Sequence, residues 1–103
     1  MAKTAEGAVK AKIKLVLEEL GAWYFCPSAN GYGRVGIPDF IGCLNGLLIA
    51  IEAKAGKGKT TALQEREIKR IREAGGFAIT VSEENIGDLK GMIEDQMRRD
   101  WVL

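Results

Sequence analysis

The dipeptide Asn45-Gly46 constrains the fold more than any other feature, because it separates two apolar runs. Both of its residues tolerate positive φ, and Asn-Gly between apolar runs is the strongest local signal for a β-hairpin. The sequence around it, FIGCL-NG-LLIAIEAK, therefore predicts two antiparallel strands over residues 39–44 and 47–54.

The far end of this hairpin carries charged side chains. Residues alternate between the two faces of a strand, so Glu52 and Lys54 project side by side. A turn at 45–46 makes paired residue numbers sum to about 91, which places Asp39 across from Glu52. Two carboxylates that meet at one sheet end repel unless a cation joins them. Hard oxygen ligands in a chain without histidine point to Mg²⁺ or Mn²⁺.

The remaining elements follow from periodicity and from glycine and proline positions. We predict a helix over 5–20, a short aromatic strand over 22–26, a loop over 27–36, a helix over 61–74, a strand over 77–82 and a helix over 85–99. This order predicts an α/β (α+β) protein with a mixed sheet flanked by helices. The chain has 103 residues, 47% of them hydrophobic, so we expect one small domain over 1–103.

The net charge of +1 hides an uneven distribution. Residues 54–72 hold seven basic and two acidic side chains, a net charge of +5, whereas residues 73–103 hold three basic and seven acidic side chains. Such local positive fields bind phosphate backbones. A solvated helix face is the alternative interpretation, and charge alone does not decide between them.

The two cysteines, Cys26 and Cys43, lie far apart in apolar segments. With no histidine and no C-x-x-C pair, a zinc site is excluded, and we expect both to be reduced core residues of an intracellular protein. The first residues lack the apolar core of a signal peptide, and the longest strongly apolar run, 47–51, is too short to span a membrane.

The segment 53–60, AKAGKGKT, also fits a relaxed phosphate-binding loop with Lys59 on the phosphates. Against this interpretation, the preceding strand follows a hairpin, and the strand over 77–82 does not end in the aspartate that magnesium would need. The pattern itself carries little information. The glycine- and lysine-rich loop is still expected to contact DNA.

The sequence resembles the PD-(D/E)XK nuclease superfamily, and the matching residues are Pro38-Asp39 followed by Glu52-Ala53-Lys54. More narrowly it resembles a stand-alone VRR-NUC domain of the virus type, with GIPDF, IEAK and Gln64 in matching order. The resemblance covers nearly the whole chain. It implies an αβββαβ core of the restriction-endonuclease type with a C-terminal helix.

The resemblance implies a role for each matching residue. Asp39 and Glu52 would bind Mg²⁺ or Mn²⁺, with the Ala53 carbonyl as a third protein oxygen. Lys54 would orient the attacking water or stabilise the pentacovalent phosphate, and Gln64 would position the water or a phosphate. Glu6, on the first helix, would hold a water of the metal. Basic residues on the first helix and on the two glycine-rich loops are assigned to DNA contacts: Lys10, Lys14, Arg34, Lys57 and Lys59.

Simpler roles are open for each of these residues. Gln64 fits the N3 position of a capping box that starts at Thr61, and Glu6 is a first-turn acid favoured by the helix dipole. Asp39 fits an Asx turn after proline. Glu52 and Lys54 could form a structural ion pair. The aromatic residues Trp23, Tyr32 and Trp101 fit core or interface positions better than base-stacking positions.

The function we expect is a metal-dependent DNA endonuclease that hydrolyses phosphodiester bonds. The resemblance points to structure-selective action on branched DNA such as Holliday junctions, by a homodimer, in the cytoplasm of a bacterium or a phage-infected host cell. A non-catalytic DNA-binding module on the same fold is the first alternative, and a phosphate-loop protein is the second.

Overall fold

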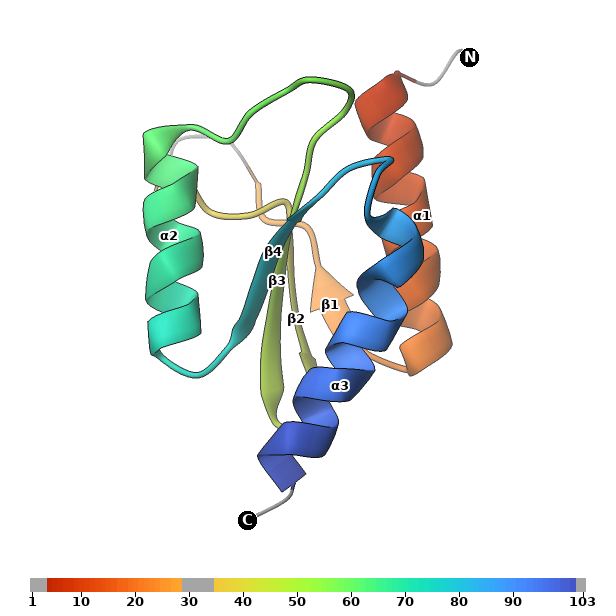
Figure 1. The fold of residues 1–103 in the computed structure, drawn as a ribbon, viewed down its shortest axis with the longest axis vertical. Helices are drawn as coiled ribbons and strands as arrows, with labels where there is room; N and C mark the ends of the chain where they lie inside the picture. Colours follow the sequence, from red (N-terminus) through yellow and green to blue (C-terminus); the bar gives the residue numbers. More distant parts are fainter. Residues whose placement is uncertain (1–3, 29–34, 102–103) are drawn as a thin grey trace.

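The computed structural model describes residues 4–28 and 35–101, which form a four-stranded sheet with helices on both faces (Figure 1). The elements in chain order are α1 (Ala5–Leu20), β1 (Trp23–Phe25), β2 (Phe40–Leu44), β3 (Leu47–Ala53), α2 (Ala62–Glu73), β4 (Phe77–Val81), the short 3-10 helix η1 (Ile86–Asp88) and α3 (Leu89–Trp101). The predicted fold class and element order are confirmed. None of the helices in these described residues is long and apolar enough to cross a membrane.

The Asn-Gly hairpin fixes the register of the sheet. Asn45 has a φ of 50° and Gly46 a φ of 87°, which is the positive-φ pair that a tight hairpin turn requires. Strand order is β1-β2-β3-β4, antiparallel except for the parallel pair β3 and β4. Phe40 pairs with Ile51, so paired numbers sum to 91 as the turn predicts, and Asp39 lies beyond the last pair, opposite Glu52.

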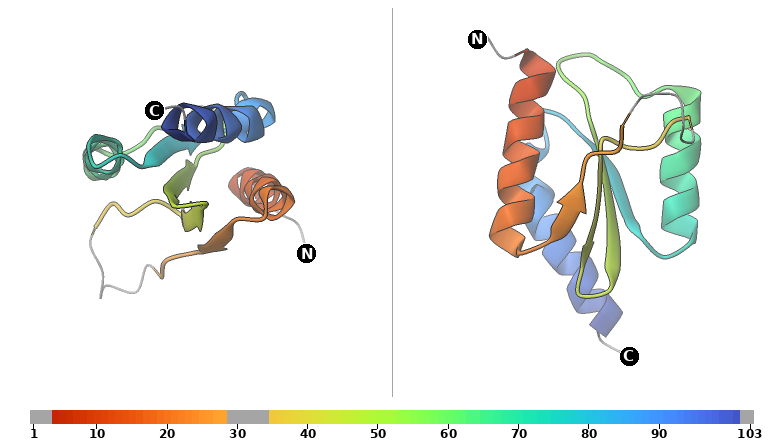
Figure 2. Two further views of the ribbon diagram at one scale, coloured as in Figure 1. Left: turned by 90° about the horizontal axis from the view of Figure 1, so that it is seen from below. Right: turned by 180° about the vertical axis from the view of Figure 1, so that it is seen from behind.

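The helices form two layers around the sheet, as the end-on view in Figure 2 shows. On one face, α1 and α3 pack against β2 and β3 and form the main core, whose central side chains include Ile13, Leu17, Phe40, Ile51 and Ile93. On the other face, α2 packs over β3 and β4 in a smaller cluster of Ala50, Ile68 and Ala78. Glu52 points to this second face, because it lies two residues after Ala50.

Several expectations about burial are wrong because α2 covers only part of its face of the sheet. Cys43 and Cys26 are exposed rather than buried, because Cys43 alternates with the core residues of β2 and faces the side that α2 leaves open. For the same reason Trp23 is 66% exposed, so it is not a core residue, and Leu48 is 42% exposed. The strand β3 is therefore not buried on both faces at its start, although its first residues are all apolar.

Some predicted boundaries also shift. The ladder of β2 begins at Phe40 rather than Asp39, because the Asp39 N–H donates to the Glu52 side chain instead of to a strand. The last predicted helix is divided into η1 and α3. The loop residues 29–34, the side chain of Trp101 and the terminal residues 102–103 lie outside the described part of the chain, and with them Tyr32 and Arg34.

Gly36 is the glycine whose lack of a side chain positions two elements. Its φ is 88°, and a Cβ there would lie 2.6 Å from the carbonyl oxygen of Leu63 and 3.1 Å from the nitrogen of Gln64. The segment that leads to Asp39 therefore packs directly on the first turn of α2. Only glycine fits both the backbone angle and the contact.

We predict that Gly36→Ala destabilises the protein more than Gly75→Ala does. Gly75 also has a positive φ, 99°, but a Cβ there would meet nothing within 4 Å, so its substitution tests backbone strain alone. Strain costs about 1–2 kcal/mol, and the overpacking at Gly36 adds roughly 1–3 kcal/mol. Urea unfolding of both variants measures the difference. Equal losses of unfolding free energy would show that Gly36 does not pack tightly on α2.

Candidate active site

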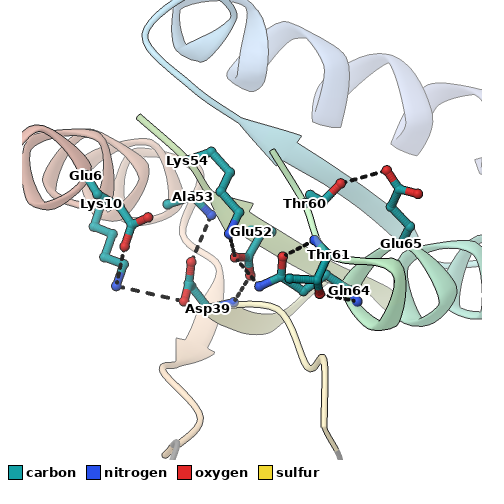
Figure 3. A network of polar contacts seen from close by, with 10 residues as sticks. All are labelled: Glu6, Lys10, Asp39, Glu52, Ala53, Lys54, Thr60, Thr61, Gln64 and Glu65. Carbon is teal, nitrogen blue, oxygen red and sulfur yellow. Dashed lines mark hydrogen bonds and ion pairs between the residues drawn. The ribbon is translucent and has the colours of Figure 1, made fainter. Parts of the chain in front are cut away.

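Two carboxylates meet at the end of the hairpin, as the sequence predicts (Figure 3). Glu52, near the end of β3, is only 3% exposed. Its Oε1 accepts the N–H of Asp39 at 3.2 Å, and Asp39 Oδ2 accepts the N–H of Ala53 at 2.9 Å. These reciprocal bonds fasten the two carboxylates to each other's strands, so their separation is set by backbone rather than by flexible side chains.

Lys54 and Gln64 complete the surroundings of Glu52. Lys54 Nζ lies 3.4 Å from Glu52 Oε2, and Gln64 Nε2 donates to the same oxygen at 2.9 Å. Gln64 also forms the expected capping box, in which its side-chain oxygen accepts the N–H of Thr61 and its own N–H donates to the Thr61 hydroxyl. Gln64 therefore has both roles: its side-chain oxygen caps the helix, and its side-chain nitrogen contacts the carboxylate of Glu52.

Burial raises the pKa of the Glu52 carboxyl above its usual range, because an apolar environment disfavours the charged form. The negative charge of Asp39 raises this pKa further. The ammonium group of Lys54 and the N–H of Asp39 act in the opposite direction, but they do not offset the burial. A cation bound at this point would oppose both effects, because it stabilises the ionised form.

Glu6 reaches the site through another residue. Lys10 Nζ lies 3.6 Å from Glu6 Oε2 and 3.8 Å from Asp39 Oδ1, and all three side chains are partly exposed. Sequence reasoning assigned Lys10 to DNA and missed its contact with Asp39. The i, i+4 spacing of Glu6 and Lys10 indicates the pair that these two residues form on α1, but no sequence pattern indicates the contact of Lys10 with Asp39.

The donor set fits a hard divalent cation. Within residues 4–28 and 35–101 no group of three His, Cys, Asp or Glu side chains converges, so the carboxylates available are those of Asp39 and Glu52. Magnesium commonly binds through one or two carboxylates and keeps several waters. In a strand the N–H and C=O of one residue point the same way. The Ala53 N–H points to Asp39, so its carbonyl does too and would be a third oxygen.

The other residues assigned to DNA lie around this end of the sheet or outside the described residues. Lys57 and Lys59 are exposed in the loop between β3 and α2, and Lys14 is exposed on α1. Arg34 falls in the part of the chain that is not described.

The loop between β3 and α2 is poorly arranged to cradle a phosphate. The N–H of Gly56 donates to both carboxylate oxygens of Glu83, at 2.9 and 3.0 Å. A hydrogen bond from its own backbone N–H, and after it the bonds from Gly56, lower the pKa of the Glu83 carboxyl. A carboxylate thus occupies a donor that a phosphate-binding loop would offer to its ligand. The sequence does not predict this contact between Gly56 and Glu83, because no local pattern connects residues so far apart in the chain.

One comparison with known proteins bears on this arrangement. A solved structure described as a VRR_NUC domain superposes on this chain with a TM-score of 0.67 and 28% sequence identity. The match covers 84% of this chain and 94% of that chain. No protein-family model matches the sequence, and no curated protein matches it. The similarity extends over nearly the full length of the other domain, so it concerns the whole fold rather than one motif.

We predict that Glu52→Gln raises the melting temperature at neutral pH when EDTA removes divalent cations. Because the folded protein raises the pKa of this carboxyl, the ionised form destabilises the fold above the folded-state pKa, and the penalty is absent below the ordinary glutamate pKa of about 4.3. The difference between variant and wild type should therefore disappear as the pH falls. Glu84→Gln, at an exposed glutamate, is the control. A wild type more stable than Glu52→Gln at neutral pH in EDTA would contradict this account.

Proposed function

We propose, from the premise that this chain is a VRR-NUC domain with the nuclease fold, that it is a Mg²⁺- or Mn²⁺-dependent DNA endonuclease. The chain is a nuclease-fold DNA-processing domain, and the proposal adds the metal and the reaction. The observation that carries it is the convergence of Asp39, Lys54 and Gln64 on the buried carboxylate of Glu52 at the sheet end.

Each of these residues has a definite task in phosphodiester hydrolysis. Asp39, Glu52 and the Ala53 carbonyl would hold the cation, which supplies charge stabilisation on a phosphoryl oxygen and lowers the pKa of water. Lys54 brings a positive charge to where negative charge develops on the phosphate. Gln64 is fixed by its capping bonds to Thr61, so its amide orients groups beside Glu52 without losing side-chain freedom during the reaction.

The buried, cation-deficient carboxylate favours catalysis over a purely structural role. An ion pair buried for structure alone contributes little to stability, because desolvation offsets the attraction. Here the pKa of Glu52 stays raised despite Lys54, so the lysine does not compensate for the burial of the carboxyl group. A non-catalytic DNA-binding module would have no need for such a carboxylate. Metal titration by calorimetry distinguishes the two functions, because a module that does not cut need not bind Mg²⁺.

We expect cleavage to depend on the cation and on both carboxylates. Wild-type protein incubated with linear, flap and four-way DNA should cut in Mn²⁺ and not in EDTA, with branched substrates preferred. Asp39→Ala and Glu52→Ala should each lower the single-turnover rate by well over tenfold, which corresponds to about 1.4 kcal/mol in the barrier, while DNA binding persists. Glu84→Ala is the matched control and should cut normally. A carboxylate variant that keeps more than roughly a tenth of the wild-type rate would refute the metal assignment.

Two of the three lysines of segment 54–59, Lys54 and Lys59, should separate catalysis from binding. Lys54 touches Glu52, so Lys54→Ala should lower the cleavage rate at saturating DNA. Lys59 is exposed in the loop, so Lys59→Ala should mainly weaken binding and lower its salt dependence by about one counterion. Cleavage rates and binding constants at several salt concentrations measure both effects. The opposite ranking, with Lys59 essential for turnover, would favour the phosphate-loop alternative.

We also propose that the protein acts as a homodimer on four-way junctions. Resolution of a junction needs two symmetric cuts, and one such domain offers one proposed site. The exposed aromatic side chains of Trp23 and Phe25 on the outer strand β1 are suited to burial by a partner. Light scattering at micromolar concentration should give twice the chain mass of 11.2 kDa. A monomer that cuts both strands of a cruciform plasmid in one binding event would exclude this assembly.

A further inference from the structure

A groove of about 530 Å³ runs between α2 and the outer strand β4. It is lined by Thr60, Glu65, Ile68, Lys69 and Arg72 on the α2 side and by Ile79 and Thr80 of β4. A second hollow of about 280 Å³ shares Arg72 and Ile79 and continues past Gly76 and Phe77. The two hollows together follow one edge of the sheet, where Figure 1 shows α2 beside β4.

The groove begins at the candidate active site. Thr80 pairs with Glu52 in the parallel ladder of β3 and β4, so both side chains face the α2 side of the sheet. Thr60 immediately precedes the capping box that holds Gln64 against Glu52. In Figure 3, Thr60 and Glu65 lie on the opposite side of Gln64 from Asp39. A ligand in the groove would therefore have one end close to the carboxylates, with Gln64 beside it.

The edge of β4 along this groove is closed to another strand. Lys54 N–H bonds to the Val81 carbonyl, so the alternate residues Ala78 and Thr80 turn their carbonyls to the outer edge. Arg72 Nε donates to the Ala78 carbonyl at 2.7 Å, and Asn85 Nδ2 donates to the Thr80 carbonyl at 3.1 Å. Side chains thus occupy the acceptors that an added β-strand would need, which disfavours a peptide as the ligand.

The charges of the groove suit an anionic chain. Lys69 forms no ion pair with any side chain among the described residues, whereas Arg66 and Arg70 on the same helix pair with Glu67. The bond to Ala78 fixes the guanidinium of Arg72 through one of its five N–H groups. The acidic member of the groove, Glu65, accepts the hydroxyl of Thr60 at 2.8 Å.

We propose that this groove binds the sugar–phosphate backbone of a single unpaired DNA strand that extends from the cleavage site. The inference rests on the proposed function and adds a substrate feature to it. The groove is bounded by one helix and one strand that are in contact through Ile68 and Ala78, which suits a single strand better than a duplex. Lys69 and Arg72 contact the phosphates of that strand.

Fluorescence anisotropy with the non-cleaving variant Asp39→Asn in Mg²⁺ tests the proposal. Addition of Lys69→Gln should weaken binding to a duplex with a single-stranded tail about threefold to tenfold, and should lower the salt slope for that DNA by about 0.7. Binding to a blunt duplex should stay unchanged. Lys69→Arg should restore the tailed-DNA affinity, because it keeps the charge. Lys90→Gln, on α3 and paired with Glu19, is the control outside the groove.

The outcomes separate the groove from the proposed function. If Asp39→Asn binds tailed and blunt DNA and Lys69→Gln leaves both affinities unchanged, or lowers both equally, the groove assignment is overturned and the nuclease proposal stands. If Asp39→Asn binds neither DNA, the proposed function fails and the groove inference fails with it. Selective loss of tailed-DNA binding, with rescue by arginine, supports the groove.

Discussion

The burial of one carboxylate, that of Glu52, is the constraint on which the rest of the site depends. An ionised carboxyl group in an apolar environment requires hydrogen bonds and positive charge. Three separate segments supply them: the N–H of Asp39, the ammonium group of Lys54 and the amide of Gln64. One side chain thereby ties the start of β2, the end of β3 and the start of α2 together. Burial, and after it the charge of Asp39, still raises the pKa of Glu52 despite these partners, and a divalent cation would stabilise the ionised form.

The first turn of α2 connects fold stability with the site. The side-chain oxygen of Gln64 caps the helix, and its side-chain nitrogen donates to Glu52. A single conformation of this side chain therefore makes both contacts. Gly36 packs against the same turn from the other side. A shift of this turn would therefore move Gln64 relative to Glu52. A residue that positions other groups is held most precisely on a rigid secondary-structure element, and Gln64 lies in the first turn of a capped helix that packs on the sheet.

The features predictable from sequence were those that a local pattern determines. Asn45-Gly46 set the hairpin register, and that register alone placed Asp39 opposite Glu52. Gln64 was identified as a site residue from the family resemblance and as a capping residue from the Thr61-x-x-Gln64 pattern. The exposure of Cys43 could not be predicted, because it depends on how much of the sheet α2 covers. The contact of Lys10 with Asp39 depends on where α1 crosses the sheet end, and the groove along β4 depends on the packing of α2, so both follow from tertiary structure alone.

The position of a bound cation tests the central claim most directly. Crystals grown with millimolar MnCl₂, with diffraction recorded at the manganese absorption edge, would locate the ion by its anomalous scattering. This account predicts an anomalous peak bonded to the carboxylates of Asp39 and Glu52 and to the Ala53 carbonyl, and no peak there in crystals of Glu52→Gln. A wild-type site without manganese at that concentration, or a peak bonded elsewhere with Glu52 still held only by Lys54 and Gln64, would contradict it.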